Sequence, residues 1–184
     1  MKMKKLTKTI VIIIGLILLI AIVLLFPLLY SGTNEIKIVE QRFLTFDEIL
    51  SQDYLQNTTA IVDIWGTYCS PCLKEFDYLA EIKEKYRDKN LKFLYLYPMK
   101  RIDHKVRWKK IIKEKQLVGI HIAVDTEELF NDIWEQYLNE PLSAKYMVPR
   151  YFIVKNGIIV VPYAAPPSSK KKLCNQIDSV LNLK

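Results

Sequence analysis

The chain has 184 residues, of which 51% are hydrophobic and 26% charged, with a net charge of +7 and a mean hydropathy of +0.06. This hydropathy excludes a disordered chain, and the length suits one domain. The composition also excludes collagen-like, coiled-coil and disulfide-stapled proteins.

Residues 10–30 contain no charged side chain and predict a transmembrane helix. A helix of this length reaches about 30 Å, the thickness of the hydrocarbon core of a bilayer. The lysines before it predict a cytoplasmic tip, with the remaining chain across the membrane: Lys2, Lys4, Lys5 and Lys8. A cleaved signal peptide is the alternative, but its apolar region is shorter and ends in small residues. We therefore expect a tip and anchor at 1–30, a linker at 31–35 and one domain at 36–184.

The net charge falls once these four lysines are set aside, because 23 basic residues then face 20 acidic ones. Such a mixed surface does not have the basic footprint of a nucleic-acid-binding protein. We expect no nucleic-acid partner.

Beyond the linker, hydrophobic patterning predicts alternating strands and helices. Strands are expected at 36–44, 60–65, 92–97 and 121–125, and a hairpin at 151–154 and 158–161 turns at Asn156-Gly157. A capping box from Thr45 to Glu48 opens a short helix to about residue 52. Further helices are expected after Cys69, at 103–116, at 126–138, and from Ser168 or Ser169 to about 183. This order predicts an α/β fold, a mixed sheet sandwiched by helices with the hairpin at one edge.

Two of the three cysteines form the motif Cys69-Ser70-Pro71-Cys72, between a buried strand and an amphipathic helix. In this context C-x-x-C indicates a redox pair. The N–H groups and positive dipole at a helix N-terminus favour the thiolate. We expect Cys69 to be the exposed nucleophile and Cys72 to attack the resulting mixed disulfide. Half of a zinc site is the alternative, but the two histidines stand apart on separate elements, so we expect no metal.

Two segments resemble thioredoxin-fold proteins, and most closely the membrane-anchored TlpA/ResA-like thiol-disulfide oxidoreductases. They are Asp63-Ile-Trp65-Gly-Thr-Tyr68-Cys69-Ser-Pro71-Cys72-Leu-Lys-Glu75-Phe and Val148-Pro149-Arg-Tyr-Phe-Ile-Val-Lys-Asn-Gly157. The resemblance implies a thioredoxin-like fold with a cis Val148-Pro149 bond against the disulfide, and substrate docking on the backbone before it. It also implies that Trp65, Tyr68 and Pro71 border the substrate site. By pattern alone, Pro149 equally suits a trans residue opening a strand.

The chain departs from that family at two positions near the motif. Tyr68 stands where tryptophan is usual, and Asp77 where many relatives have proline. These departures bear on substrate preference and not on the fold.

Two acidic residues near the motif are candidates for catalysis. The resemblance implies that Asp63 accepts the proton of Cys72, and burial raises the pKa of a carboxyl toward neutrality. An aspartate turned toward a polar pocket is the alternative. Glu75 follows Cys72 by three residues and shares its helix face; in the alternative it only complements the helix dipole.

The remaining candidates are interpreted as packing residues. Cys174 lies at helical spacing from Ile177 and Leu181, which indicates a buried core thiol rather than a resolving cysteine. Trp108 and Trp134 belong to helical apolar stripes and are expected to pack in the core.

We therefore expect an extracytoplasmic, single-pass thiol-disulfide oxidoreductase that reduces protein disulfides. Ser70-Pro71 offers no histidine to stabilise the thiolate, which favours a reducing couple. The Cys69–Cys72 disulfide is the only expected redox group. Expected partners are protein thiols and disulfides and a membrane electron donor of the thiol-disulfide type; the resemblance admits cytochrome c maturation as one process served. A disulfide oxidase or isomerase, a thioredoxin-like binding or chaperone module, and a peroxidase-like use of Cys69 are the alternatives.

Overall fold

The computed structural model describes residues 14–17, 20–21, 35–99, 104–124, 127–137 and 147–183. The chain divides into two compact units, residues 1–33 and 34–184. Among the residues so described, no helix is both long enough and apolar enough to cross a bilayer. The anchor predicted at 10–30 lies mostly outside the described residues and stays a prediction.

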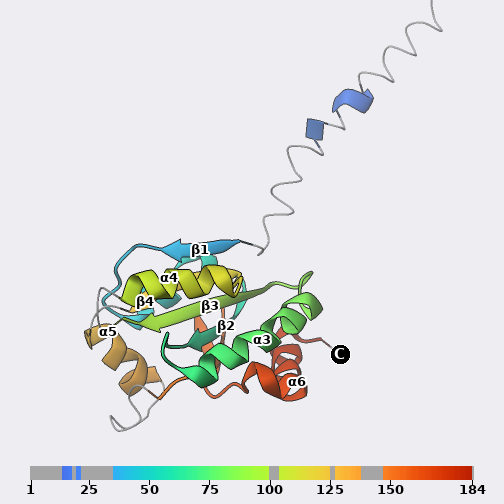
Figure 1. Ribbon diagram of the computed structural model, residues 1–184. Coiled ribbons are helices and arrows are strands. Elements are labelled where there is room, and N and C mark those ends of the chain that lie inside the picture. The colour runs from blue at the N-terminus through green and yellow to red at the C-terminus, as the bar shows by residue number, and fades with distance from the viewer. Residues whose placement is uncertain are drawn as a thin grey trace, which may run out of the picture. The chain divides into compact units, whose positions relative to one another are not determined.

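The second unit is built on a six-stranded mixed sheet with the strand order β1-β4-β3-β2-β5-β6 (Figure 1). The strands from β1 to β2 in this order are parallel, whereas β5 runs antiparallel to β2, and β6 to β5. In chain order they are β1 (Ile36–Val39), β2 (Thr59–Ile64), β3 (Leu91–Pro98), β4 (Gly119–Val124), β5 (Arg150–Lys155) and β6 (Ile158–Val161).

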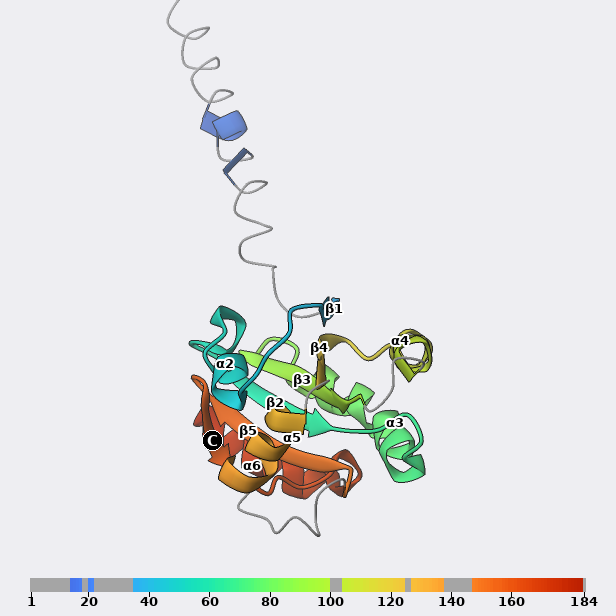
Figure 2. The same ribbon diagram turned by 90° about the vertical axis from the view of Figure 1, so that its left-hand side faces the viewer.

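Helices cover both faces of this sheet, as the sequence predicts for a sandwich. Figure 2 shows α2 and α5 on the side of the sheet opposite α3 and α4. The helices are α2 (Phe46–Leu50), α3 (Ser70–Lys85), α4 (His104–Glu114), α5 (Glu127–Asp132) and α6 (Lys170–Leu181). Two 3₁₀ turns, Asp53–Leu55 and Pro167–Ser169, and a π-helical segment, Ile133–Tyr137, complete the described elements.

Alternation along the strands divides the core into two clusters, one on each face of the sheet. From β2, Ala60, Val62 and Ile64 pack toward α2 and α5. Ile61 and the following Trp65 pack into the cluster beneath α3, α4 and α6. Because side chains alternate across a strand, Asp63 lies on the face that α3 covers. This alternation places one carboxyl group within the same core as the cysteine motif.

The hairpin of β5 and β6 forms one edge of the sheet, as predicted. Asn156 and Gly157 have φ values of 53° and 74°, the left-handed conformation that a type I′ turn requires. A Cβ atom at position 157 would lie 2.6 Å from the carbonyl oxygen of Leu50. Glycine at this position therefore permits both the turn and its close approach to α2.

Several predicted boundaries differ from the structure. The first strand ends at Val39 rather than at residue 44, because the chain leaves the sheet to bury Phe43 beside α2. In its described part, the helix predicted at 126–138 is α5 continued by the π-helical segment, and Leu129, Phe130, Ile133 and Trp134 are buried as expected. Ser169 is the N-cap of α6, but its side chain makes no capping hydrogen bond. The Ser168 hydroxyl instead donates to Glu75, so the predicted start of this helix is confirmed but no serine side chain caps it.

Candidate active site

The Cys69–Cys72 pair lies where β2 ends and α3 begins. After β2, the N–H of Trp65 donates to the Leu96 carbonyl at 3.1 Å and extends the pairing with β3. The chain then turns, with the Cys69 N–H donating to the Gly66 carbonyl at 3.1 Å. Cys69 is the N-cap residue of α3, and its sulfur accepts a hydrogen bond from the Cys72 N–H at 3.1 Å. The first turn of α3 therefore presents its N–H groups to the Cys69 sulfur.

The two cysteines are joined by a disulfide, and their sulfurs differ in accessibility. Cys72 is fully buried, whereas Cys69 is half-buried. Pro71 is exposed in the first turn, a position where proline is tolerated because its missing N–H has no helical partner. A partner sulfur can therefore reach Cys69, although Cys69 is less exposed than we expected.

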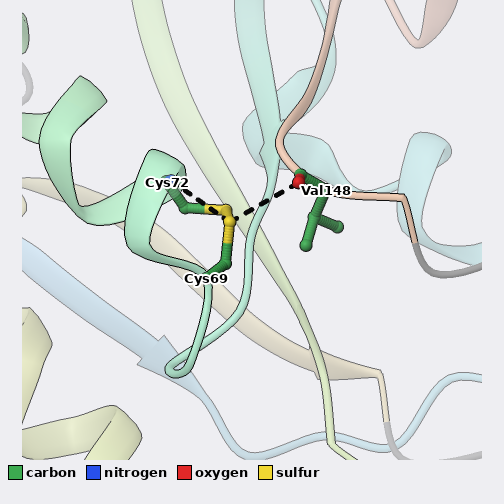
Figure 3. Close-up of a disulfide and its surroundings, with 3 residues drawn as sticks. All are labelled: Cys69, Cys72 and Val148. Carbon is green, nitrogen blue, oxygen red and sulfur yellow. Dashed lines mark hydrogen bonds between the residues drawn. A yellow bond between two sulfur atoms is a disulfide. The ribbon is translucent and has the colours of Figure 1, made fainter.

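The segment before β5 faces the disulfide across from α3 (Figure 3). The Sγ atom of Cys69 lies 3.5 Å from the carbonyl oxygen of Val148. The peptide bond between Val148 and Pro149 is cis, as the resemblance implies. Both residues are half-buried, so the backbone at position 148 borders the accessible sulfur.

Asp63 is 3% exposed, and neither of its carboxyl oxygens has a hydrogen-bond partner among the described residues. It pairs with Tyr95 on β3 and with Tyr151 on β5, so buried tyrosines flank it on both neighbouring strands. Burial raises the pKa of Asp63 well above its usual value, the charge of Glu75 raises it further, and Lys83 opposes both. The ionised carboxyl is thereby a stronger base than that of an ordinary aspartate.

Lys83 brings a cation from α3 onto the same buried face. Its ammonium group donates to the Val118 carbonyl at 2.6 Å and lies 5.4 Å from the centre of the Tyr95 ring. Burial lowers the pKa of Lys83 to about 7, and the charge of Asp63 partly offsets this shift. The ammonium group of Lys83 therefore titrates near neutral pH, on the same face of the sheet as Asp63.

His121 on β4 continues this polar row across the sheet. It pairs with Tyr95, and the two rings are stacked with their centres 4.6 Å apart. Its Nε2 atom lies 2.6 Å from the Leu117 carbonyl oxygen. Burial lowers the pKa of His121 to about 4, so the ring is neutral at physiological pH.

Glu75 lies one turn after Cys72 and is half-buried. Its carboxylate accepts hydrogen bonds from the backbone N–H of Ser168 at 2.7 Å and from the Ser168 hydroxyl at 2.8 Å. These bonds tie α3 to the 3₁₀ turn before α6, and the negative charge raises the pKa of Asp63. The side chain therefore has a structural role and an electrostatic effect on Asp63.

The other candidate residues lie around or away from the disulfide. Trp65 is fully buried and packs edge-to-face on Phe76 with ring centres 5.0 Å apart. Tyr68 is 68% exposed beside Cys69. Trp108 and Trp134 are buried in the two cores, which confirms their interpretation as packing residues. In the described part of the chain, no cluster of three or more His, Cys, Asp or Glu side chains could hold a metal ion.

Cys174 is a free thiol on α6 and is half-buried, not fully buried as expected. It lies near the end of α3, where the Tyr86 hydroxyl donates to the Cys174 carbonyl at 3.1 Å. Cys69 lies at the opposite end of that helix, which is 16 residues long and so about 24 Å from end to end. Cys174 is thus remote from the disulfide.

Sequence reasoning missed the surroundings of Asp63, which include Lys83 and the paired Tyr95 and Tyr151. Tyr95 and Tyr151 were read as parts of apolar strands, and their shared face depends on register, which pattern alone does not supply. Tyr95 and Tyr97 stand at alternate positions of a buried strand and therefore share one face of the sheet. This spacing was the signal available in the sequence.

The fold and the cysteine motif agree with the comparisons to known proteins. The Redoxin family model matches residues 47–179. The chain belongs to the Redoxin family. A comparison with curated protein sequences finds no significant match.

Solved structures show the same fold. A Bacteroides vulgatus protein described as a thiol-disulfide oxidoreductase is 26% identical, with a TM-score of 0.54 over 70% of this chain and 76% of that one. A Bacteroides fragilis thiol-disulfide oxidoreductase is 16% identical, with a TM-score of 0.53 over 71% and 87%. A thiol:disulfide interchange protein from Bacteroides sp. is 21% identical, with a TM-score of 0.51 over 71% and 76%. This Redoxin-family chain thus has the thioredoxin-like fold of thiol-disulfide oxidoreductases, and it carries a Cys69–Cys72 disulfide.

Proposed function

We propose that this protein is a thiol-disulfide oxidoreductase that reduces protein disulfides with its Cys69–Cys72 dithiol. The observation that carries the proposal is the difference between the two sulfurs. Cys69 is accessible at the N-terminus of α3 and accepts the Cys72 N–H, whereas Cys72 is buried behind the first turn. The proposal needs no metal or organic cofactor.

The reaction begins with the reduced pair. The Cys69 thiolate, favoured by the N–H groups of α3, attacks one sulfur of a substrate disulfide, and the other substrate sulfur leaves as a thiolate. Cys72 then loses its proton and attacks Sγ of Cys69. The mixed disulfide breaks, the Cys69–Cys72 disulfide forms, and the second substrate sulfur leaves. Two electrons pass from the dithiol to the substrate.

Asp63 is the proposed acceptor of the Cys72 proton. It lies on the face of β2 that α3 covers, between Ile61 and Trp65, which pack in the same core as Cys72. A carboxyl whose pKa is raised toward that of a thiol is a better proton acceptor than an ordinary aspartate. Lys83 and Glu75 then tune Asp63 in opposite directions by their charges.

The proposed direction of electron flow rests on the residues between the cysteines. Ser70 and Pro71 place no histidine between the two cysteines, and the Cys69 sulfur accepts a hydrogen bond from the backbone N–H of Cys72. A less stabilised thiolate gives a more reducing couple. Reduction is therefore favoured over oxidation or isomerisation by the same fold.

The proposed location follows from the uncharged residues 10–30 and the lysines before them. They support a membrane-anchored protein of the TlpA/ResA-like type, with its oxidoreductase domain outside the cytoplasm. In that location its dithiol would be regenerated by a membrane electron donor of the thiol-disulfide type. Cytochrome c maturation is one process that such a reductase could serve.

Reduction of insulin by the full-length protein tests the proposed activity. We expect catalysed precipitation of the insulin B chain in the presence of dithiothreitol, and no catalysis by Cys69→Ser. Cys174→Ser is the matched control, because it removes a thiol remote from the disulfide. Equal insulin reduction with and without the protein would support a binding module with a structural disulfide instead.

A further inference from the structure

A pocket of about 300 Å³ opens beside the accessible sulfur. Its walls include the aromatic side chains of Trp65, Tyr68 and Tyr97, together with Cys69, Val148 and His104. Because Cys69 and Val148 both border the pocket, a substrate segment that reaches the sulfur also reaches this space. Among the described residues that line it, none is acidic.

Arg107 supplies a cation at the rim of this pocket. Its guanidinium carbon lies 4.4 Å from the centre of the Tyr68 ring, and its Nε–H donates to the Thr67 carbonyl at 3.4 Å. His104 contacts the same tyrosine ring, with ring centres 5.2 Å apart. Two residues of α4 therefore hold Tyr68 beside Cys69, and the guanidinium remains exposed.

Arg107 differs from the neighbouring lysines of α4, because each of those lysines lies close to a carboxylate. Lys105 and Lys109 both pair with Glu40, at 2.8 Å and 2.7 Å. Lys110 lies 3.7 Å from Glu114. Within the described residues Arg107 pairs with no carboxylate, and the carboxylate of Glu75 accepts its hydrogen bonds from Ser168. Among those residues, the positive charge of Arg107 beside Tyr68 is not neutralised by an ion pair.

We propose that this rim selects protein substrates with an aspartate or glutamate next to the reacting cysteine, and that Arg107 binds that carboxylate. The inference rests on the proposed function, because it requires that substrate disulfides react at Cys69. A guanidinium presents a planar fork of donors that suits a carboxylate, and its stacking on Tyr68 holds the fork in place. The aromatic walls of the pocket accommodate an apolar side chain from the same segment.

The experiment uses three peptide disulfides that differ only in the residue after the reacting cysteine, which is Glu, Gln or Lys. The rate constant for their reduction by the reduced full-length protein is measured at low and high salt. We expect the Glu peptide to react about fivefold faster than the Gln peptide at low salt, a factor near the upper end for an exposed ion pair. The Lys peptide should be slowest, and salt should reduce the differences.

The Arg107→Gln variant tests whether Arg107 recognises the charge of the substrate or only supports the Tyr68 ring. We expect this variant to lose the preference for the Glu peptide, so that the Glu and Gln peptides react at equal rates. Lys113→Gln is the matched control, since Lys113 is an exposed cation on the same helix about 9 Å further along its axis, and it should keep the preference.

Equal rates for the Glu and Gln peptides with the wild type would overturn this inference and leave the proposed function intact. An equal loss on all three peptides in Arg107→Gln would also overturn it, because the arginine would then only support Tyr68. Failure of the wild-type protein to reduce any of the three peptides would instead overturn the proposed function.

Discussion

Asp63 stands directly opposite Tyr95 in the pairing of β2 with β3, and neither side chain has a hydrogen-bond partner among the described residues. Burial in such surroundings raises the pKa of a carboxyl group, which makes its ionised form a stronger base. The same face of the sheet packs against α3, whose first turn contains Cys72. This arrangement underlies the role that we propose for Asp63.

Replacing Asp63 with asparagine should slow the second half of the reaction. The amide keeps the shape of the side chain but cannot accept the Cys72 proton, so release from the mixed disulfide should slow by about a hundredfold, the lower range for general base catalysis. Attack by Cys69 should change little. Stopped-flow measurement of both steps tests this, and an equal effect on both would return Asp63 to a structural role.

The charges around Asp63 predict opposite shifts in the pH dependence of release. Glu75 raises the pKa of Asp63 and Lys83 lowers it. Glu75→Gln should therefore move the rise of the release rate to lower pH, and Lys83→Met should move it to higher pH. The pH profile of mixed-disulfide resolution checks both variants. Shifts in the same direction would contradict the electrostatic explanation.

Cys72→Ser should trap substrates. The variant keeps the attacking Cys69 but lacks the thiol that resolves the mixed disulfide. Adducts sensitive to dithiothreitol should therefore accumulate with Cys72→Ser and be absent with Cys69→Ser. Cys174→Ser serves as the control and should behave as the wild type does. Adducts that persist in Cys69→Ser would show that the roles are exchanged or that Cys174 takes part.

Features that depend on short local motifs could be predicted from the sequence, whereas features that depend on the pairing register of the strands could not. Thr45 caps the short helix as expected, with the Glu48 N–H donating to the threonine hydroxyl, whereas the Glu48 carboxylate accepts from the Leu44 N–H and not from that of Thr45. The Asn156-Gly157 turn and the position of Cys69 at a helix N-terminus also follow from short motifs. Local signals of this kind sufficed for the fold and for the cysteine pair.

The row from Tyr151 through Asp63 and Tyr95 to His121 could not be predicted in the same way. Its members come from four strands far apart in sequence, and their alignment depends on the pairing register. The bond between Glu75 and Ser168 joins residues 93 positions apart. Helical spacing placed Glu75 near Cys72, but no local pattern indicates that the 3₁₀ turn before α6 donates hydrogen bonds to the Glu75 carboxylate.

His121 should make the protein sensitive to acid. Its pKa is about 4 in the folded state and near 6.5 when exposed. Between these values the unfolded chain binds a proton that the folded chain does not, so stability is lost as the pH falls from about 6.5 to 4. The loss amounts to at most about 3 kcal/mol. Urea unfolding of His121→Phe against pH tests this, since the variant keeps an aromatic ring against Tyr95. An unchanged slope in this window would contradict the assignment.

The anchor prediction concerns where the domain lies in the cell. If residues 10–30 span the membrane with the lysines inside, protease added to spheroplasts should digest the domain and leave cytoplasmic proteins intact. The same protein should partition with membranes after washing in high salt. Protection of the domain from protease in intact spheroplasts would contradict this topology.

The reduction potential of the Cys69–Cys72 couple tests the proposed reductase most directly. Equilibration of the full-length protein with glutathione buffers, followed by thiol alkylation, gives the value. We expect a potential nearer that of thioredoxin, about −270 mV, than that of a strong oxidant, about −120 mV. A value above about −180 mV would contradict the account and assign the protein to disulfide oxidation or isomerisation.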